Sequence, residues 1–415
     1  MLWGTQGEVK ARKRPVMLSQ FQFAYDHDFK GQICLVRVDF NVPIKQGKIT
    51  DDTRIRRVLP SLTRLIAQGA KLVLLSHLGR PKGNIVPELS LKPIASYVSE
   101  LLNQPVSFIE DVTTTDAINA CADMKNGDVI MAENLRFWPG EEANETEFAS
   151  CLAKLGDVFI ADAFSAAHRA HASTQAITNH LPAYVGDQMA AELKALSDVL
   201  VAPERPVVAV VGGAKVSTKL AVLENLVQKT DALILGGGMA NSFLGAQGID
   251  MKASLAEPDL YDTARHIIDA AKSANCQLVI PTDGLAATEF AANAAHRAIN
   301  NEDMVDGEMM LDVGPASIAK AIEVVNSAKT ILWNGPMGAF EITPFDTATV
   351  AVAKAVAART KSGDVVSVAG GGDTVAALNV AGVSDEFSYL SLAGGAFLEW
   401  LEGKTLPGVA ALQKS

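Results

Sequence analysis

Arginine and histidine residues follow four apolar runs in the first half of the chain. A guanidinium pairs with phosphate or carboxylate through a planar fork, so several together predict a site for a small anion that carries both groups. A lone arginine would indicate only a solvated surface group. Arg54 follows the first run, and the segments after the runs read Asp39-Phe40-Asn41, Ser76-His77-Leu78-Gly79-Arg80-Pro81, Glu133-Asn134-Leu135-Arg136 and Asp162-Ala163-Phe164-Ser165, the last continuing into His168-Arg169-Ala170-His171.

Glycine clusters take the corresponding places in the second half. Glycine turns before helices let backbone N–H groups approach phosphate oxygens, and the helix N-terminus adds partial positive charge. We expect Lys215 and Lys219 to lie one turn apart on the helix after the first cluster. The pattern favours a nucleotide site, and the alternative is that the glycines only pack helix against strand. The clusters are Gly212-Gly213-Ala214-Lys215, Gly236-Gly237-Gly238-Met239, Asn334-Gly335-Pro336-Met337-Gly338 and Gly370-Gly371-Gly372-Asp373-Thr374.

Apolar, β-branched runs precede these segments and alternate with helical patterns. Continuous apolar strands that alternate with helices predict parallel sheets covered on both faces. In such sheets, ligands bind beyond the carboxyl ends of the strands. The predicted strands are residues 33–38, 72–75, 129–131 and 158–160 in the first half, and 207–211, 232–235, 277–280, 330–333 and 365–368 in the second.

The composition excludes several classes of protein. A chain of 415 residues predicts two or three domains. The 36 basic and 47 acidic residues give a net charge of −11, which argues against nucleic acid as a partner. No apolar run is long enough to span a membrane, so we expect no membrane partner. The four cysteines lack paired spacing, which favours reduced thiols and a cytoplasmic location.

Common catalytic motifs are missing. The chain lacks the P-loop motif G-x-x-x-x-G-K-[ST], which excludes a P-loop NTPase. It also lacks the dinucleotide-binding motif G-x-G-x-x-G, which argues against a dinucleotide-dependent dehydrogenase. H-E-x-x-H and G-x-S-x-G are also missing, which argues against a zinc protease and an α/β-hydrolase.

The first sixteen residues differ from the rest, with four basic residues, one acidic residue and no apolar core of a secretory signal. A nucleic-acid arm or an organelle address is one alternative. We interpret residues 1–16 as a disordered or added extension, or the result of an upstream start codon, and expect the fold to begin at Met17.

Eight motifs, in order along the chain, resemble those of the phosphoglycerate kinase family. The resemblance runs from about Met17 to the C-terminus. It implies reversible phosphoryl transfer between 1,3-bisphosphoglycerate and ADP, giving 3-phosphoglycerate and ATP in glycolysis and gluconeogenesis. The motifs are Val38-Asp39-Phe40-Asn41-Val42-Pro43, Ser76-His77-Leu78-Gly79-Arg80-Pro81, Glu133-Asn134-Leu135-Arg136-Phe137, His168-Arg169-Ala170-His171, Gly212-Gly213-Ala214-Lys215-Val216, Trp333-Asn334-Gly335-Pro336, Gly370-Gly371-Gly372-Asp373-Thr374 and Leu401-Glu402-Gly403-Lys404.

The resemblance also implies a division of this α/β chain into two doubly wound, Rossmann-like parallel-sheet domains. The domain that binds 3-phosphoglycerate would span residues 17–186, and a hinge helix would span 187–204. The nucleotide-binding domain would span 205–394, and residues 395–415 would pack back on the first domain. Because the sequence shows no coiled-coil heptads, we expect a monomer.

The family's site positions carry over residue by residue. We expect catalytic roles for Arg54, Lys215, Lys219 and Gly371, direct transfer without a phosphohistidine, and substrate-binding or loop-anchoring roles for His77 and His171. The acid-substrate positions match Asp39, Phe40, Asn41, Arg54, His77, Leu78, Gly79, Arg80, Arg136 and Arg169. The ATP/ADP positions match Lys215, Lys219, Asn334, Glu341, Gly370, Gly371, Gly372, Asp373 and Thr374, with Mg²⁺ on Asp373 and the ribose on Glu341.

A few positions depart from the commonest family pattern. Ser165-Ala166 stands where Gly-Thr is frequent, and Ala393 and Phe397 replace a glycine and a small residue. We expect these changes to affect loop shape rather than a charged group.

Two rival hypotheses for the function are a nucleotide-dependent dehydrogenase and an inactive anion-binding scaffold. The missing glycine fingerprint argues against the first, and the full set of Arg54, Lys215, Lys219 and Asp373 argues against the second.

Overall fold

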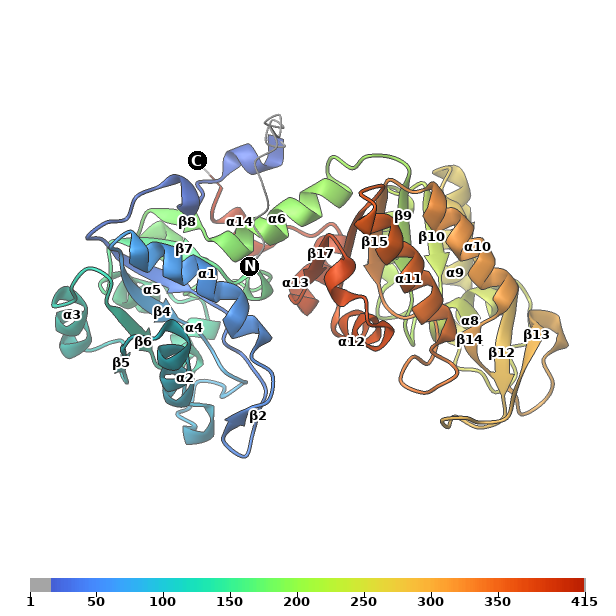
Figure 1. The fold of residues 1–415 in the computed structure, drawn as a ribbon, viewed down its shortest axis with the longest axis horizontal. Helices are drawn as coiled ribbons and strands as arrows, with labels where there is room; N and C mark the ends of the chain where they lie inside the picture. Colours follow the sequence, from blue (N-terminus) through green and yellow to red (C-terminus); the bar gives the residue numbers. More distant parts are fainter. Residues whose placement is uncertain (1–15, 414–415) are drawn as a thin grey trace.

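The computed structural model describes residues 16–413, which form two lobes connected by one long helix (Figure 1). The predicted extension at residues 1–16 lies outside the described residues except for Val16, which begins a short 3₁₀ helix (Val16–Gln20).

The N-terminal lobe is built on a six-stranded parallel sheet in the order β5-β6-β4-β1-β7-β8. Alternate residues of β1 pack on opposite faces, since Leu35 and Val36 belong to different core clusters. The strands are β1 (Ile33–Arg37), β4 (Lys71–Leu75), β5 (Val106–Ile109), β6 (Val129–Ala132), β7 (Val158–Ala161) and β8 (Ala183–Val185). The helices are α1 (Thr53–Ala67), α2 (Lys92–Leu102), α3 (Thr115–Ala122), α4 (Pro139–Glu142) and α5 (Thr146–Ala153), and β2 (Ile44–Lys45) pairs with β3 (Lys48–Ile49).

The C-terminal lobe repeats this architecture with the strand order β11-β10-β9-β15-β16-β17. Two core clusters again cover its faces. The strands are β9 (Val207–Val211), β10 (Ala232–Leu235), β11 (Gln277–Val279), β15 (Thr330–Asn334), β16 (Val366–Gly370) and β17 (Tyr389–Ser391). The helices are α7 (Leu220–Val227), α8 (Gly237–Ala246), α9 (Tyr261–Ser273), α10 (Pro315–Ser327), α11 (Thr347–Lys361) and α12 (Gly372–Ala381).

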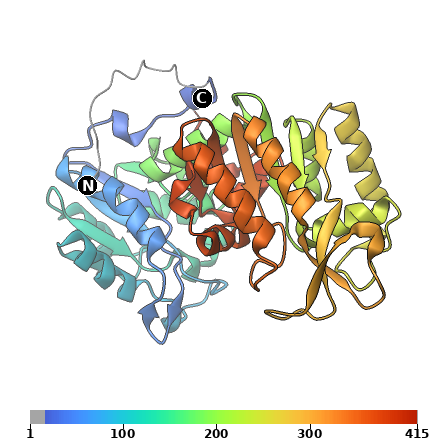
Figure 2. The ribbon, with the colours of Figure 1, turned by 45° about the vertical axis from the view of Figure 1, so that its right-hand side comes forward.

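A three-stranded antiparallel sheet, which the sequence did not predict, lies at the outer end of the C-terminal lobe (Figures 1 and 2). It consists of β12 (Asp283–Ala287), β13 (His296–Asn300) and β14 (Met309–Val313). Only Ile299 is buried in β13, so this edge strand has no apolar run to indicate it.

Two connections cross between the lobes. Helix α6 (Asp187–Leu200) runs from one lobe to the other, and Arg64 of α1 fixes its first residue through two hydrogen bonds to Asp187, of 2.8 and 3.1 Å. After β17 the chain forms α13 (Gly394–Leu401) and α14 (Pro407–Ala410) and returns to the N-terminal lobe, where Gly408 N donates to Ala167 O at 2.9 Å. The predicted fold class is confirmed.

Phe397 connects the returning segment to the end of β16. The side chain is fully buried, and its ring lies against Gly370, where a Cβ atom would stand 2.8 Å from the ring. We expect Phe397→Ala to lower the free energy of unfolding by about 3–5 kcal/mol, because the lost contacts leave a cavity. Urea denaturation followed by circular dichroism measures this loss. Half-buried Leu398 provides the matched control with a smaller expected loss, and an equal loss in both variants would contradict the assigned packing.

Candidate active site

A cavity of about 370 Å³ lies at the carboxyl ends of the strands in the N-terminal lobe. Its wall contains arginines from separate segments of the chain, with the first residues of α13 at its rim. Convergence from several strand ends is the geometry expected of a ligand site in a parallel sheet. Of the predicted acid-substrate residues, the cavity is lined by Asp39, Asn41, Arg54, His77, Gly79, Arg80, Arg136 and Arg169.

Arg54 is held by groups from both lobes. Its Nη1 donates to Asp39 Oδ2 at 2.8 Å and to Asn41 O at 3.1 Å. Its Nη2 donates to Leu392 O, between β17 and α13, at 3.4 Å. A third of the side chain stays exposed (34 %), so the guanidinium is both oriented and accessible.

Arg136 is almost fully buried in the cavity wall. Its Nη1 donates to Gly79 O at 2.7 Å, and its Nε lies 3.3 Å from Glu142 Oε1. Burial lowers the pKa of Arg136 to about 10, with Glu142 opposing the shift and the positive charge of Arg169 adding to it. The side chain therefore remains a cation at neutral pH.

The two predicted histidines occupy different positions. His77 lines the cavity, and burial together with Arg37 and Arg136 holds its pKa well below 6.5. His171 does not line it, and its backbone N–H donates to Thr174 Oγ1 at 3.0 Å, as expected of a loop anchor. Burial lowers the pKa of His171 to about 3. Both rings are therefore neutral at pH 7.

Three residues differ from their predicted surroundings. The side chains of Phe40 and Leu78 are buried in the hydrophobic core, so only their backbone can serve a ligand. The expectation that Ser165 affects only loop shape was wrong. Its hydroxyl donates to Asp39, the carboxylate that also accepts from Arg54.

The glycines of the C-terminal lobe have two distinct roles. A Cβ atom on Gly212 would lie 1.8 Å from Pro336 O, and one on Gly236 would lie 2.6 Å from Met337 Cα. These two glycines allow neighbouring turns to pack closely. By contrast, a Cβ atom on Gly213 would meet only the Lys219 side chain, and one on Gly372 would meet nothing within 4 Å. Gly213 and Gly372 thus leave backbone accessible to a ligand.

The expectation that Lys215 and Lys219 share a helix face was wrong. Helix α7 begins at Leu220, and Lys219 has a non-helical backbone with φ −134°. Buried Val216 and the bond from Ser217 Oγ to Glu257 Oε1 (2.5 Å) hold residues 215–219 as a turn. Lys215 is consequently exposed.

Lys219 instead crosses between two strand ends. Its Nζ donates to Gly212 O at 2.6 Å and to Asn334 O at 2.9 Å. Burial lowers its pKa to about 8, and the charge of Asp373 opposes this shift. Lys219 is therefore a partly desolvated cation within the electrostatic influence of Asp373.

The remaining predicted nucleotide residues surround this lysine or stand at the surface. Asn334 Nδ2 donates to Gly370 O and Thr374 Oγ1 accepts from Gly335 N, both at 2.7 Å, so these side chains connect the ends of β15 and β16. Asp373 lies exposed in the first turn of α12, after Gly371 with φ +103°, and Glu341 is exposed. Within residues 16–413, no cluster of three or more His, Cys, Asp or Glu side chains could hold a metal ion.

Comparisons with known proteins identify the family of this chain. The family model described as phosphoglycerate kinase matches residues 24–404. The chain belongs to the phosphoglycerate kinase family. Accordingly, it is a phosphotransferase that reversibly transfers phosphate between 1,3-bisphosphoglycerate and ADP in glycolysis.

Named relatives and solved structures support the membership. The chain is 57% identical to the phosphoglycerate kinase of Sinorhizobium medicae over 93% of this chain and 97% of that protein. It is 56% identical to the phosphoglycerate kinase of Methylorubrum extorquens over 92% of this chain and 96% of that protein. The Coxiella burnetii phosphoglycerate kinase structure has 43% identity and a TM-score of 0.89 over 94% of this chain and 98% of that one. The Pyrococcus horikoshii structure has 30% identity and a TM-score of 0.75 over the same shares. None of the helices among residues 16–413 could span a membrane.

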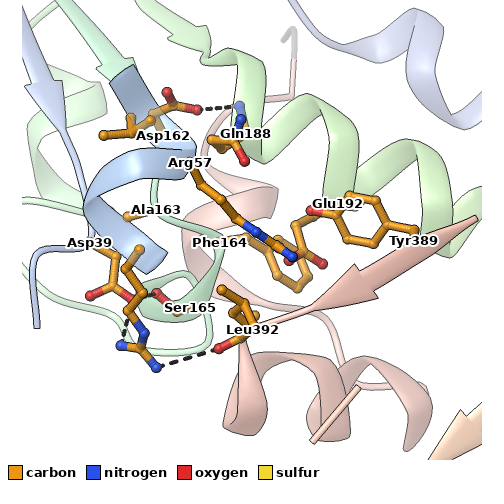
Figure 3. A pocket seen from close by; sticks show the side chains of 13 residues that line it. Asp39, Arg57, Asp162, Ala163, Phe164, Ser165, Gln188, Glu192, Tyr389 and Leu392 are labelled. Carbon is orange, nitrogen blue, oxygen red and sulfur yellow. Dashed lines mark hydrogen bonds and ion pairs between the residues drawn. The ribbon is translucent and has the colours of Figure 1, made fainter. Parts of the chain in front are cut away.

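Two smaller cavities include residues that the sequence did not indicate. One, of about 60 Å³, lies where the lobes meet and is lined by Arg57 of α1, Glu192 of α6 and Tyr389 of β17 (Figure 3). Arg57 also donates to Leu390 O at 2.8 Å. The other, of about 20 Å³, lies beside Gly237. Both cavities include residues of segments that the sequence did indicate, Asp39, Arg54 and Ser165 in the first and Gly237 and Met337 in the second. The residues that the sequence did not indicate, Arg57, Glu192 and Tyr389, lie in two helices and a short edge strand.

Proposed function

We propose that 3-phosphoglycerate binds in the basic cavity of the N-terminal lobe and that ATP or ADP binds on the glycine turns around Lys219. The phosphoryl group then passes directly between them after the lobes close about α6. One observation carries the proposal: the arginines that line the cavity all come from the N-terminal lobe, and none of the predicted nucleotide residues lines it. The two sets of residues must approach each other before the substrates can react.

The chemistry consists of positioning and charge stabilisation. A phosphoryl group in transfer resembles metaphosphate, with negative charge spread over its equatorial oxygens. Arg54 from one lobe and Lys219 from the other would neutralise this charge, and exposed Lys215 would reach the nucleotide phosphates. The backbone N–H groups at Gly371 and Gly372, where α12 begins, would add a partial positive charge. The substrate carboxylate attacks directly, so no protein group needs to carry the phosphate.

Asp373 is the residue that fits Mg²⁺. Its carboxylate is exposed in the first turn of α12, and its charge partly offsets the fall in the pKa of Lys219 that burial causes. Magnesium commonly binds one or two carboxylates and completes its shell with water and substrate phosphates, so a single carboxylate suffices. When bound, the ion would neutralise charge on the nucleotide phosphates.

The domain boundaries belong to this proposal. We assign residues 17–186 to the acid-binding domain, 187–204 to the hinge, 205–394 to the nucleotide-binding domain and 395–415 to the returning segment. A monomeric, cytoplasmic enzyme without nucleic-acid partners stays a prediction.

Isothermal titration of two variants tests the separation of the sites. We expect Arg169→Ala to weaken 3-phosphoglycerate binding by about 10- to 100-fold and leave Mg·ADP binding unchanged, since a lost charged hydrogen bond is worth ~1.5–3 kcal/mol. We expect Asp373→Asn to weaken Mg·ADP binding and to leave 3-phosphoglycerate binding unchanged. The matched controls Arg56→Ala and Asp385→Asn remove exposed charges outside the assigned sites. If either test variant weakened both ligands equally, the assignment to separate lobes would be wrong.

A further inference from the structure

A buried polar network lies behind the basic cavity. Arg37, the last residue of β1, is 1 % exposed and does not line the cavity. Its Nε donates to Ser173 Oγ at 2.9 Å, its Nη1 donates to Val38 O at 2.6 Å, and its Nη2 lies 3.0 Å from His77 Nδ1. The proposed chemistry gives Arg37 no role, yet its guanidinium contacts a ring that lines the acid site.

The direction of each bond in the network is fixed by chemistry. Arginine has donors and no acceptor, so Nδ1 of His77 must accept from Arg37. A neutral imidazole that accepts at Nδ1 carries its proton on Nε2. The low pKa of His77, caused by burial and by the charges of Arg37 and Arg136, keeps the ring neutral.

Glu141 provides the charge that opposes Arg37. Its carboxylate is fully buried and accepts from Ser173 Oγ at 2.6 Å and from Ser173 N at 3.0 Å. The Ser173 hydroxyl therefore accepts from Arg37 and donates to Glu141, which gives a continuous chain of bonds from the carboxylate to His77. Buried charges of this kind require partners, and here each has one.

We propose that Arg37, held by Ser173 and Glu141, is a positioning residue that fixes His77 in the Nε2–H tautomer. The ring then presents an N–H donor to 3-phosphoglycerate. The ionised carboxylate and phosphate of that ligand have only acceptor oxygens. Against either group, the opposite tautomer would direct a lone pair at another lone pair. This role rests on the proposed placement of the acid in the basic cavity.

Nitrogen-15 NMR on the histidine-labelled full-length enzyme tests the tautomer without substrate. We expect the His77 resonances, identified by their loss in His77→Gln, to show a protonated Nε2 and an unprotonated Nδ1. A protonated Nδ1 would overturn the proposal. In the pair Arg37→Met with Glu141→Gln, which leaves no buried charge unpaired, we expect Nδ1–H to become populated. If the folded double variant kept the Nε2–H tautomer, Arg37 would not be the residue that fixes it.

Kinetics tests the consequence for the substrate. The amide nitrogen of glutamine can occupy the position of Nε2, and that of asparagine the position of Nδ1. We expect His77→Gln to keep the KM for 3-phosphoglycerate within about threefold and His77→Asn to raise it by about tenfold or more, the value of one lost hydrogen bond to a charged group. The reverse order would overturn the proposal. If the wild-type ring carries its proton on Nε2 but 3-phosphoglycerate does not shift its resonances, the proposed binding of the acid in this cavity would be wrong. The assigned tautomer of His77 would still hold.

Discussion

Arg54→Ala is expected to lower kcat by about 10²–10³, equivalent to ~2.7–4 kcal/mol of transition-state stabilisation, while ADP binding is unchanged. Asp39, Asn41 O and Leu392 O orient this guanidinium at the cavity, so it is preorganised for charge that develops in the transition state. Alanine removes that charge, and water that replaces it must reorganise during the reaction. A coupled assay of ATP formation from 1,3-bisphosphoglycerate measures kcat, and calorimetry measures ADP binding.

Arg56→Ala is the matched control for Arg54. Arg56 lies two residues away on the same helix, is exposed and pairs with Asp52 at 2.7 Å. Its loss removes the same formal charge from α1 and should leave kcat unchanged. Wild-type turnover in Arg54→Ala, or an equal loss in both variants, would show that Arg54 does not stabilise the transferring group.

Lys219→Met should lower kcat by a similar ~10²–10³, because it removes the desolvated cation of the nucleotide lobe. The pKa of about 8 adds a pH signature. Lys219 is charged below this pH and loses its charge as the pH rises through it, so kcat/KM for the nucleotide should fall above about pH 8. Lys219→Arg keeps a charge at all these pH values and should remove that alkaline decline. If kcat/KM still declined above about pH 8 in Lys219→Arg, a group other than Lys219 would cause the decline.

The lowered pKa of Lys219 has the opposite effect on stability: the free energy of unfolding should rise with pH, whereas kcat/KM falls. In the unfolded chain Lys219 has its ordinary pKa of 10.5, so between about pH 8 and 10.5 the unfolded state binds more protons than the folded state. The burial penalty on Lys219 is present below about pH 8 and is relieved as the pH rises through this window.

The central strands of both sheets were predictable, because strands buried on both faces are continuous apolar runs. Their carboxyl ends then identified Arg54, Arg136 and Arg169 as members of one cavity wall. The edge strands β5, β8 and β17 were missed since they are short and only partly buried. The antiparallel sheet was missed because β13 buries one residue of five.

The interactions that orient the site were harder to predict. The turn at residues 215–219 depends on a bond from Ser217 to Glu257, forty residues away. The Lys219 contacts depend on Asn334, which is still farther along the chain. Arg37 did leave a signal, since it is the one charged residue inside the apolar run 33–38. A charge at a position buried on both faces of a sheet requires a partner, although the sequence does not say which.

The proposed mechanism requires two lobes that carry different substrates and must come together. Small-angle X-ray scattering of the wild-type enzyme, alone, with each ligand and with 3-phosphoglycerate plus a non-transferable ATP analogue and Mg²⁺, tests this most directly. We predict that the radius of gyration falls clearly only when both ligands are bound, because closure about α6 brings Arg54 and Lys219 to the same phosphoryl group. An unchanged radius of gyration with both sites saturated would contradict closure and with it the proposed mechanism.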